Sequence, residues 1–264
     1  ATNSSGNATV VNDAGLQLAA STVGGALSAT ATTGNISDSG NLAVTGAATF
    51  ITGASGSNII LDASGNAFSN AVTLQADDGS EAFGNITFVD SGAVRLHSSA
   101  GANGDLYINA ATDAAVGGNL NVTATTGNIT QGRAVAVGGT SSFTTSQTDA
   151  DITLNNANNA FTGAVVLNTT GSTGHATVVD ASGLDLGAST VGGNLAATAA
   201  TGNITDSGNL TITGTSSFTT SANNATITLN NTNALAGAVT ITTNDDSGTD
   251  ADVTIDNGTT ALIL

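Results

Sequence analysis

The chain has 264 residues, with two basic and 19 acidic side chains, a formal net charge of −17, and neither cysteine nor proline. This charge argues against a nucleic acid partner, because phosphate binding needs lysine and arginine, and it disfavours anionic membrane surfaces. Without cysteine neither disulfides nor thiolate metal sites can form, and no apolar run approaches the ~20 residues of a membrane span, so we expect no membrane insertion.

The chain begins with a stretch that it later repeats. Residues 8–50 are nearly restated by residues 176–218, and a partial third copy covers 116–143. Self-similarity of this kind is the signature of stacked repeats rather than of one irregular domain. The acidic, cysteine-free, Thr/Asn/Ser/Gly-rich composition also suits a protein exported to the cell exterior, so we expect an extracellular or cell-surface location.

One motif sets the register of the repeats. TVVDASGLDL at Thr177 has counterparts that start at Thr9, Thr87 and, in a looser form, Val253, which gives spacings of 78, 90 and 76 residues. We therefore expect a single continuous segment over 1–264. Its super-repeats are predicted at about 9–86, 87–176, 177–252 and, in part, 253–264.

The second super-repeat is longer than the others. Leu96 and Val116 are 20 positions apart, whereas the equivalent landmarks elsewhere are 5 apart, so an inserted coil or loop is predicted at 97–111. With three further residues near 76–84 the excess is 18 residues, which suggests a smallest unit of about 18–19 residues. Four such units would make a super-repeat, and the whole chain would form about 14 coils in a rod of about 65–70 Å at ~4.8 Å per coil.

The local patterns are those of short β-strands. Segments such as NLTITG and ATITLNN cluster β-branched residues between GN, DSG and NN turn signals, and no 3.6-residue periodicity is present. A unit of 18–19 residues is long enough for three short strands and three tight turns, which is one coil of a parallel β-helix. A β-sandwich would not need to repeat in sequence, so an all-β solenoid is predicted.

Particular residue types are expected at particular places in each coil. Small and branched aliphatic residues should fill the narrow interior, and Gly and Asn should occupy corners that need positive φ. Phe50, Phe143 and Phe218 recur once per super-repeat and are predicted to fill one wider corner. Stacked Asn side chains are expected to form hydrogen-bonded ladders along the rod.

These segments resemble a known family. GNLNVTATTGNIT, GNITDSGNLTITGTSSF and LDLGASTVGGNL are similar to the degenerate coils of filamentous-haemagglutinin-like adhesins, the large exoproteins of bacterial two-partner secretion, and the likeness covers essentially the whole chain. The resemblance implies a right-handed parallel β-helix, export across an outer membrane, and a role in adhesion or extracellular scaffolding.

The strongest metal candidate is an acidic segment near the C-terminus. Its carboxylates are hard oxygen ligands of the kind that calcium prefers, although their spacing matches neither an EF-hand loop nor the nonapeptide of calcium-binding β-rolls. Solvated turn acids are the alternative interpretation. The candidate calcium ligands are Asp245, Asp246, Asp250, Asp252 and Asp256.

Other polar groups suggest weaker candidates. Arg95, His97, Asp105 and Tyr107 bring basic and aromatic chemistry together beside the insertion and could contact a ligand, although an extra coil with Tyr107 at its surface or corner is the simpler interpretation. His175, at a repeat junction, is expected to be a turn residue. Threonine pairs invite an ice-binding interpretation, but they do not recur at one fixed place in the sequence of every unit.

Three classes of function remain open. We expect no enzyme and no cofactor other than calcium, because the chain lacks the clustered Asp with Lys or Arg on which polysaccharide-cleaving β-helices rely. The first expectation is an extracellular rod segment of a large bacterial adhesin or fibre protein, contacting a host or cell-surface glycan or protein. The alternative is a self-assembling subunit of an extracellular filament or sheath. Partners would be flanking repeats of a longer chain or neighbouring copies end to end.

Overall fold

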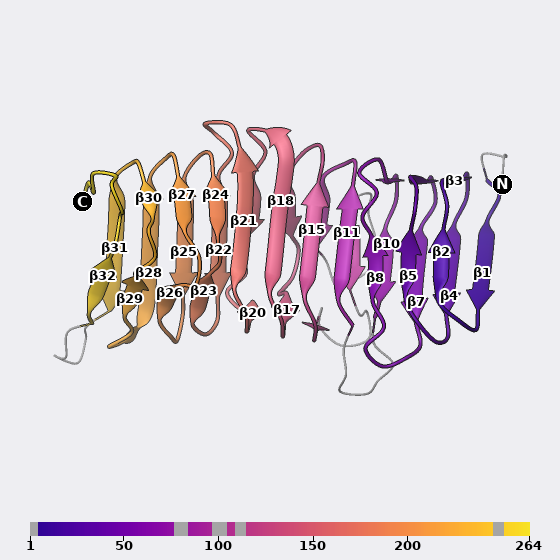
Figure 1. Ribbon diagram of the computed structural model, residues 1–264, viewed down its shortest axis with the longest axis horizontal. Helices are drawn as coiled ribbons and strands as arrows, with labels where there is room; N and C mark the ends of the chain where they lie inside the picture. The colour runs from indigo at the N-terminus through magenta and orange to yellow at the C-terminus, as the bar shows by residue number, and fades with distance from the viewer. Residues whose placement is uncertain (1–4, 77–83, 97–104, 109–114, 245–250) are drawn as a thin grey trace.

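The protein is an all-β solenoid of about ten turns in the computed structural model, with its two termini at opposite ends (Figure 1). The structure describes residues 5–76, 84–96, 105–108, 115–244 and 251–264. Within these residues every paired strand runs parallel to its neighbours and there is no helix. The expected fold class is confirmed.

Two long sheets run along the rod. Sheet A has, in spatial order, β1 (Ala8–Asn12), β4 (Leu27–Ala31), β7 (Ala48–Thr52), β10 (Val72–Gln75), β13 (Asp105–Ile108), β12 (Val94–Leu96), β16 (Ile129–Gln131), β19 (Ile152–Leu154), β22 (Ala176–Asp180), β25 (Leu195–Ala199), β28 (Ser216–Asn223) and β31 (Val239–Asn244). Sheet B has β2 (Leu16–Leu18), β5 (Ile36–Asp38), β8 (Ile59–Leu61), β11 (Ile86–Asp90), β15 (Leu120–Ala124), β18 (Ser141–Thr148), β21 (Val165–Thr170), β23 (Leu184–Leu186), β26 (Ile204–Asp206), β29 (Ile227–Leu229) and β32 (Val253–Ile255).

Shorter strands close the narrow edge of each coil. Sheet C contains β3 (Ser21–Val23), β6 (Leu42–Val44) and β9 (Ala67–Phe68). Sheet D contains β14 (Ala115–Val116), β17 (Ala136–Val137) and β20 (Ala160–Phe161). Their counterparts toward the C-terminus join sheet B through β21 and are β24 (Ser189–Val191), β27 (Leu210–Ile212) and β30 (Ala234–Leu235).

One coil consists of a long strand, a short strand and a narrow-edge strand, as in β4, β5 and β6. Successive long strands start 19, 21 and 24 residues apart between β1 and β10, and 19, 21 and 23 apart between β22 and β31. Coils are thus longer than the 18–19 residues expected, and the estimates of 14 coils and 65–70 Å are wrong. Twelve strands of sheet A at ~4.8 Å correspond to roughly 53 Å.

The long strand changes sheets at each super-repeat. After three coils, β10 adds a fourth long strand on sheet A, and β11 then follows as another long strand on sheet B, where Ile86 pairs with Ile59 of β8. The same step returns the long strand to sheet A at β22 and places β32 on sheet B. A super-repeat is therefore three and a half coils rather than four, and the long side alternates between the two faces of the rod.

A polar side chain at each junction accepts a hydrogen bond from the backbone N–H group that the change of sheet leaves without a strand partner. Where the long strand crosses over, the last narrow-edge strand has no neighbour above it, and its N–H would be buried without a partner. Asp90 accepts a hydrogen bond from the N–H of Phe68, and Asp180 accepts one from the N–H of Phe161. In the third junction Asn257 accepts from the N–H of Leu235 at 2.7 Å.

The core is a single hydrophobic column inside the coils. Alternate residues of each strand point inward, as the buried–half-buried pattern of β25 illustrates, so that Leu195, Ala197 and Ala199 are buried. Phe50, Phe143 and Phe218 are fully buried at the centres of long strands, not at a wider corner as expected. A flat coil is widest between its two long sides, which is where an aromatic ring fits.

The wide corners are closed by buried threonines. In the third coil of each super-repeat the Thr hydroxyl donates to the carbonyl five residues later, as from Thr145 to Ala150 and from Thr220 to Ala225, both at 3.1 Å. Equivalent bonds start at Thr52 and Thr169. These corners account for the longer coils, because they add residues without adding a strand.

Candidate functional site at the end of the coil stack

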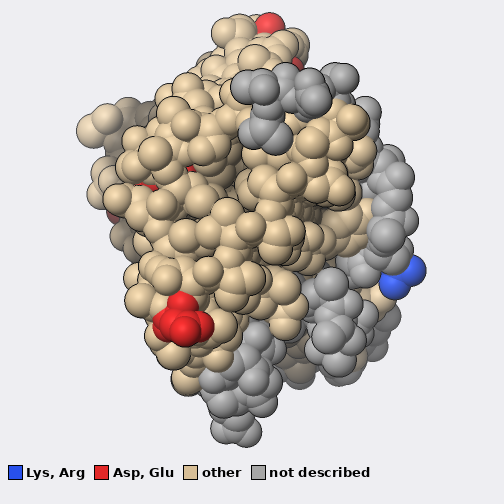
Figure 2. Space-filling model, turned by 90° about the vertical axis from the view of Figure 1, so that its right-hand side faces the viewer, with Lys and Arg blue, Asp and Glu red and all other residues tan. Residues whose placement is uncertain are grey.

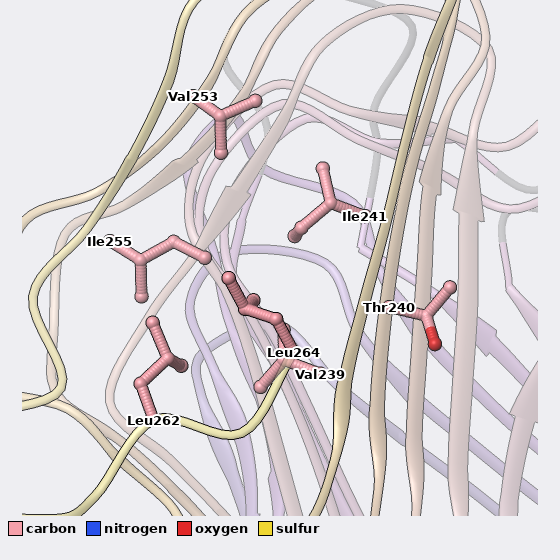
Figure 3. A pocket seen from close by; sticks show the side chains of 7 residues that line it. All are labelled: Val239, Thr240, Ile241, Val253, Ile255, Leu262 and Leu264. Carbon is pink, nitrogen blue, oxygen red and sulfur yellow. The ribbon is translucent and has the colours of Figure 1, made fainter.

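The last described coil leaves an apolar recess open to solvent. Its volume is about 610 Å³, and six of its seven lining residues are aliphatic. Figure 3 shows these aliphatic side chains gathered over the end of the core, with Thr240 turned away from them. The lining residues are Val239, Thr240, Ile241, Val253, Ile255, Leu262 and Leu264.

Two strands of the solenoid and the final residues of the chain build this recess. Val239 and Ile241 come from the inward face of β31, and Val253 and Ile255 from the inward positions of β32, which pairs with β29. The final residues cross back toward sheet A, where the N–H of Val239 donates to the carbonyl of Ile263 at 2.7 Å. The recess is therefore the interior of the coil seen from its end.

These side chains are exposed to solvent, although the core of the rod is buried elsewhere. Val253 is 44 % exposed and Leu264 is 84 % exposed, whereas the inward residues of internal coils are buried. No ionisable side chain lines the recess. Such a surface is suited to van der Waals contact with another apolar layer.

The opposite end has a smaller recess of about 260 Å³, lined by residues that include Ala8, Val10 and Leu18. Val11 nearby is 63 % exposed. Figure 2 looks onto this end and shows a mainly uncharged described surface, with scattered acidic side chains and a basic group at one side. Both ends of the described stack are thus apolar and carry strand edges that run in the same direction.

The candidate calcium ligands are only partly described. Asp245, Asp246 and Asp250 lie outside the described residues. Asp252 and Asp256 are exposed, and a carboxylate oxygen of Asp256 accepts a hydrogen bond from the N–H of Gly258 at 2.8 Å. Among the described residues, no group of three or more His, Asp or Glu side chains is placed to hold a metal ion. Calcium binding here stays a prediction.

The ligand-contact candidates beside the insertion are only partly described. His97 lies outside the described residues, as does most of the insertion. Strand β13 from the insertion lies in sheet A between β10 and β12, where Arg95 and Asp105 are register partners. Tyr107 is only 4 % exposed, so the expectation of a surface or corner tyrosine is wrong.

Threonine recurs at one outward position of sheet A in many coils but, as expected, not in every coil. In sheet A, Thr9 pairs in register with Ser28, which pairs with Thr49, and Thr153 pairs with Thr177 farther along. Tyr107, Arg95 and Ala196 interrupt the row. Sequence spacing hid this row because the coils differ in length, and the high β-propensity of threonine explains it without a ligand.

Most polar side chains at the corners bind the backbone of the next coil. Asn58 accepts from the N–H of Asn85 at 2.7 Å, and Asn85 accepts from the N–H of Asn119 at 2.8 Å. The expected Asn ladders are therefore present, but they join side chain to backbone. His175 belongs to such a ladder, directly before β22, and is not part of a catalytic triad in the described residues.

Within the described residues no helix is long and apolar enough to cross a membrane. A family model described as repeats of unknown function (DUF5649) matches residues 5–75, 83–168 and 173–242. No curated protein and no solved structure matches the chain.

Proposed function

The chain belongs to the DUF5649 family of repeats, and on that premise we propose that it is a non-catalytic structural rod. The observation that carries the proposal is the continuity of its hydrogen bonding. Sheets A and B each span the described length of the solenoid, and side-chain ladders reinforce the corners between them. A rod of this kind transmits force along its axis, because separating two coils requires breaking many parallel bonds together.

The use of buried polar groups supports a structural rather than a chemical role. Asp206 accepts hydrogen bonds from the backbone N–H of Asn230 at 2.9 Å and from the side chain of Asn233 at 2.8 Å. Asn233 in turn accepts from the N–H of Leu210. Side chains that are committed to the backbone in this way fix the coil and are not free to act on a substrate.

We place the rod outside the cell, as a segment of a large bacterial surface adhesin or fibre protein that projects or links surfaces. The net charge of −17, the absence of cysteine and lysine, and the resemblance to filamentous-haemagglutinin-like coils support this placement. An epitope inserted at the exposed corner beside Asn224 should be accessible to antibody on intact cells that make the protein. Labelling only after lysis would contradict an extracellular location.

A second experiment separates a rod from an adhesive surface. Outward substitutions such as Thr177→Ala should leave cell attachment unchanged, whereas the buried substitution Phe143→Asp should abolish it by disrupting the stack. If Thr177→Ala and Thr49→Ala together removed attachment while the fold was retained, the surface of the solenoid would itself be the contact. Release of reducing ends from an acidic glycan by the pure protein would instead indicate an enzyme.

The open apolar recess favours one alternative, a self-assembling subunit of an extracellular filament or sheath. Head-to-tail contact would extend both sheets without a change of strand direction, and a heterologous contact that does not close produces a fibre. Sedimentation and electron microscopy of the purified chain test this alternative. Ordered fibres that disappear in Leu264→Asp, but persist in the outward control Thr254→Asp, would support the filament; isolated rods at all concentrations would contradict it.

A further inference from the structure

His175 takes the place of an asparagine at a repeated position of the corner ladders. At the equivalent corner of the first super-repeat, the side-chain oxygen of Asn7 accepts a hydrogen bond from the N–H of Ala26 at 2.9 Å. In the second, Asn85 accepts from the N–H of Asn119 at 2.8 Å. In the third, Nδ1 of His175 accepts from the N–H of Asn194 at 2.9 Å.

The substitution changes what protonation can do. A carboxamide oxygen accepts a hydrogen bond over the whole physiological pH range, whereas an imidazole nitrogen accepts only when it carries no proton. The bond to Asn194 therefore requires the neutral ring with its proton on Nε2. When the ring is protonated, Nδ1 becomes a donor and faces the N–H of Asn194.

The groups around the ring differ above and below it. On the coil above, it packs against Gly193 and Asn194, which are uncharged; a side chain at Gly193 would meet Nδ1 at 2.4 Å. On the coil below, Asp151 accepts a hydrogen bond from the backbone N–H of His175 at 2.8 Å. The Asp149 carboxylate is near enough for its charge to interact with that of the ring.

Asp149 is suited to receive a positive ring. Hydrogen bonds from the backbone N–H and the side chain of Thr173 hold the pKa of this carboxyl below its usual range, and the charge of His175 contributes in the same direction. A protonated ring thus has carboxylates beneath it and an amide donor above it. Protonation of the ring therefore removes the hydrogen bond from Asn194 and strengthens the attraction to the coil below.

We propose that His175 makes the second super-repeat junction a pH-responsive point of the rod, at which acidification releases the Asn194 amide. The corner between β21 and β22 loosens, while the equivalent positions Asn7 and Asn85 keep their bonds. The inference does not depend on where the rod is located or on what it attaches to.

Amide hydrogen exchange of the full chain, expressed as protection relative to an unstructured chain at the same pH, tests the proposal. Between about pH 8 and about pH 5, the range in which histidine changes charge, protection of the Asn194 amide should fall about tenfold, the factor expected for one lost hydrogen bond. The Ala26 amide, bonded to Asn7, is the internal control and should not change. Nitrogen NMR of the ring should show unprotonated Nδ1 at about pH 8.

Two variants complete the test. His175→Asn restores the residue type of the first super-repeat and should keep Asn194 protected at both pH values. Asp149→Asn removes a negative charge near the ring and should weaken the loss of Asn194 protection on acidification. The proposal is overturned if protection of Asn194 does not change with pH in the native chain, or if the same fall occurs in His175→Asn. A ring that carries its proton on Nδ1 at about pH 8 would also overturn it.

Discussion

The first two junctions at which the long strand changes sheets share a motif but are held by different forces. At the first, Phe68 stacks on Phe88 with ring centroids 5.5 Å apart and meets Phe50 edge-on at 6.0 Å. At the second, Phe161 meets Phe143 edge-on at 6.1 Å, and Val178 stands at the position of Phe88. The first junction therefore has the larger aromatic cluster.

The hydrogen bonds to the junction aspartate are shorter at the second junction than at the first. Asp180 accepts from the N–H of Phe161 at 2.7 Å and from the N–H and hydroxyl of Ser182 at 2.7 and 2.8 Å. Asp90 accepts from the N–H groups of Phe68 and Gly92 at the longer distance of 3.3 Å, and burial raises its pKa although hydrogen bonds from these groups and from Ser91 lower it. The same half-coil step can thus be stabilised by aromatic packing or by hydrogen bonds to a carboxylate.

Truncation of Phe68 and Phe161, whose backbone N–H groups donate to the junction aspartates, should have the largest effect on stability. We expect Phe68→Ala to lower the free energy of unfolding by about 4 kcal/mol and Phe161→Ala by about 3 kcal/mol, because buried Phe→Ala changes cost 3–5 and Phe68 loses two ring contacts. Urea unfolding followed by circular dichroism measures both. An equal or reversed order would break the distinction between the junctions.

Removal of the carboxylates should give the reverse order. Asp180→Ala leaves the N–H of Phe161 buried without a partner and should cost about 3 kcal/mol, whereas Asp90→Ala, with its longer contacts, should cost about 1 kcal/mol. Exchange protection of the Phe161 and Phe68 amides reports the same loss locally. Equal losses of stability in the two variants would show that the difference in hydrogen-bond length does not affect the free energy of unfolding.

Transfer of the missing hydroxyl should make the first junction resemble the second. A side chain at Gly92 would meet nothing closer than the Asp90 carboxylate at 3.9 Å, so Gly92→Ser fits and can donate as Ser182 does. We expect about 1 kcal/mol of stabilisation at neutral pH and a lower pKa for Asp90. Gly92→Ala, which adds the carbon without the hydroxyl, is the matched control and should not lower that pKa.

The pH dependence of stability should depend on Asp90. A carboxyl whose pKa is raised on folding binds its proton more tightly in the folded chain, so stability is greatest at low pH. It falls as pH increases from 3.8, the usual value, through the raised value, and then levels off. Asp90→Asn should remove this contribution and raise the unfolding midpoint at neutral pH. Stability profiles of the two proteins that run parallel between about pH 3 and about pH 7 would contradict the assignment.

The sequence was sufficient to predict the solenoid but not its half-coil step. The motif starting at Thr87 and Thr177 marks each new super-repeat, yet nothing in a linear pattern indicates that β11 and β22 lie on opposite sheets. The step becomes visible only when Ile86 pairs with Ile59, a short-strand residue. Variable corners also obscured the coil length, because Thr145 and Thr220 close loops whose residues add no strand.

The candidate site was harder to predict than the fold. The sequence favours the acidic segment near the C-terminus as a site because its charges cluster there. The recess is instead built from aliphatic residues such as Val253 and Leu264, which look like ordinary core residues in sequence. Asp90 and Asp180 stand at the fourth position of the motif, so its repetition could have identified them as a set. Their partners, Phe68 and Phe161, lie 22 and 19 residues earlier and could not be paired without the fold.

The half-coil step also governs how the rod can change in length. Each super-repeat contributes three coils and one further long strand, so removal of one unit would turn everything beyond it by half a revolution about the axis. Removal of two neighbouring units would shorten the rod and leave the orientation of the remainder as it was. Gene duplications and deletions in such an array are therefore expected to be tolerated most easily in pairs, wherever one face of the rod must point in a fixed direction.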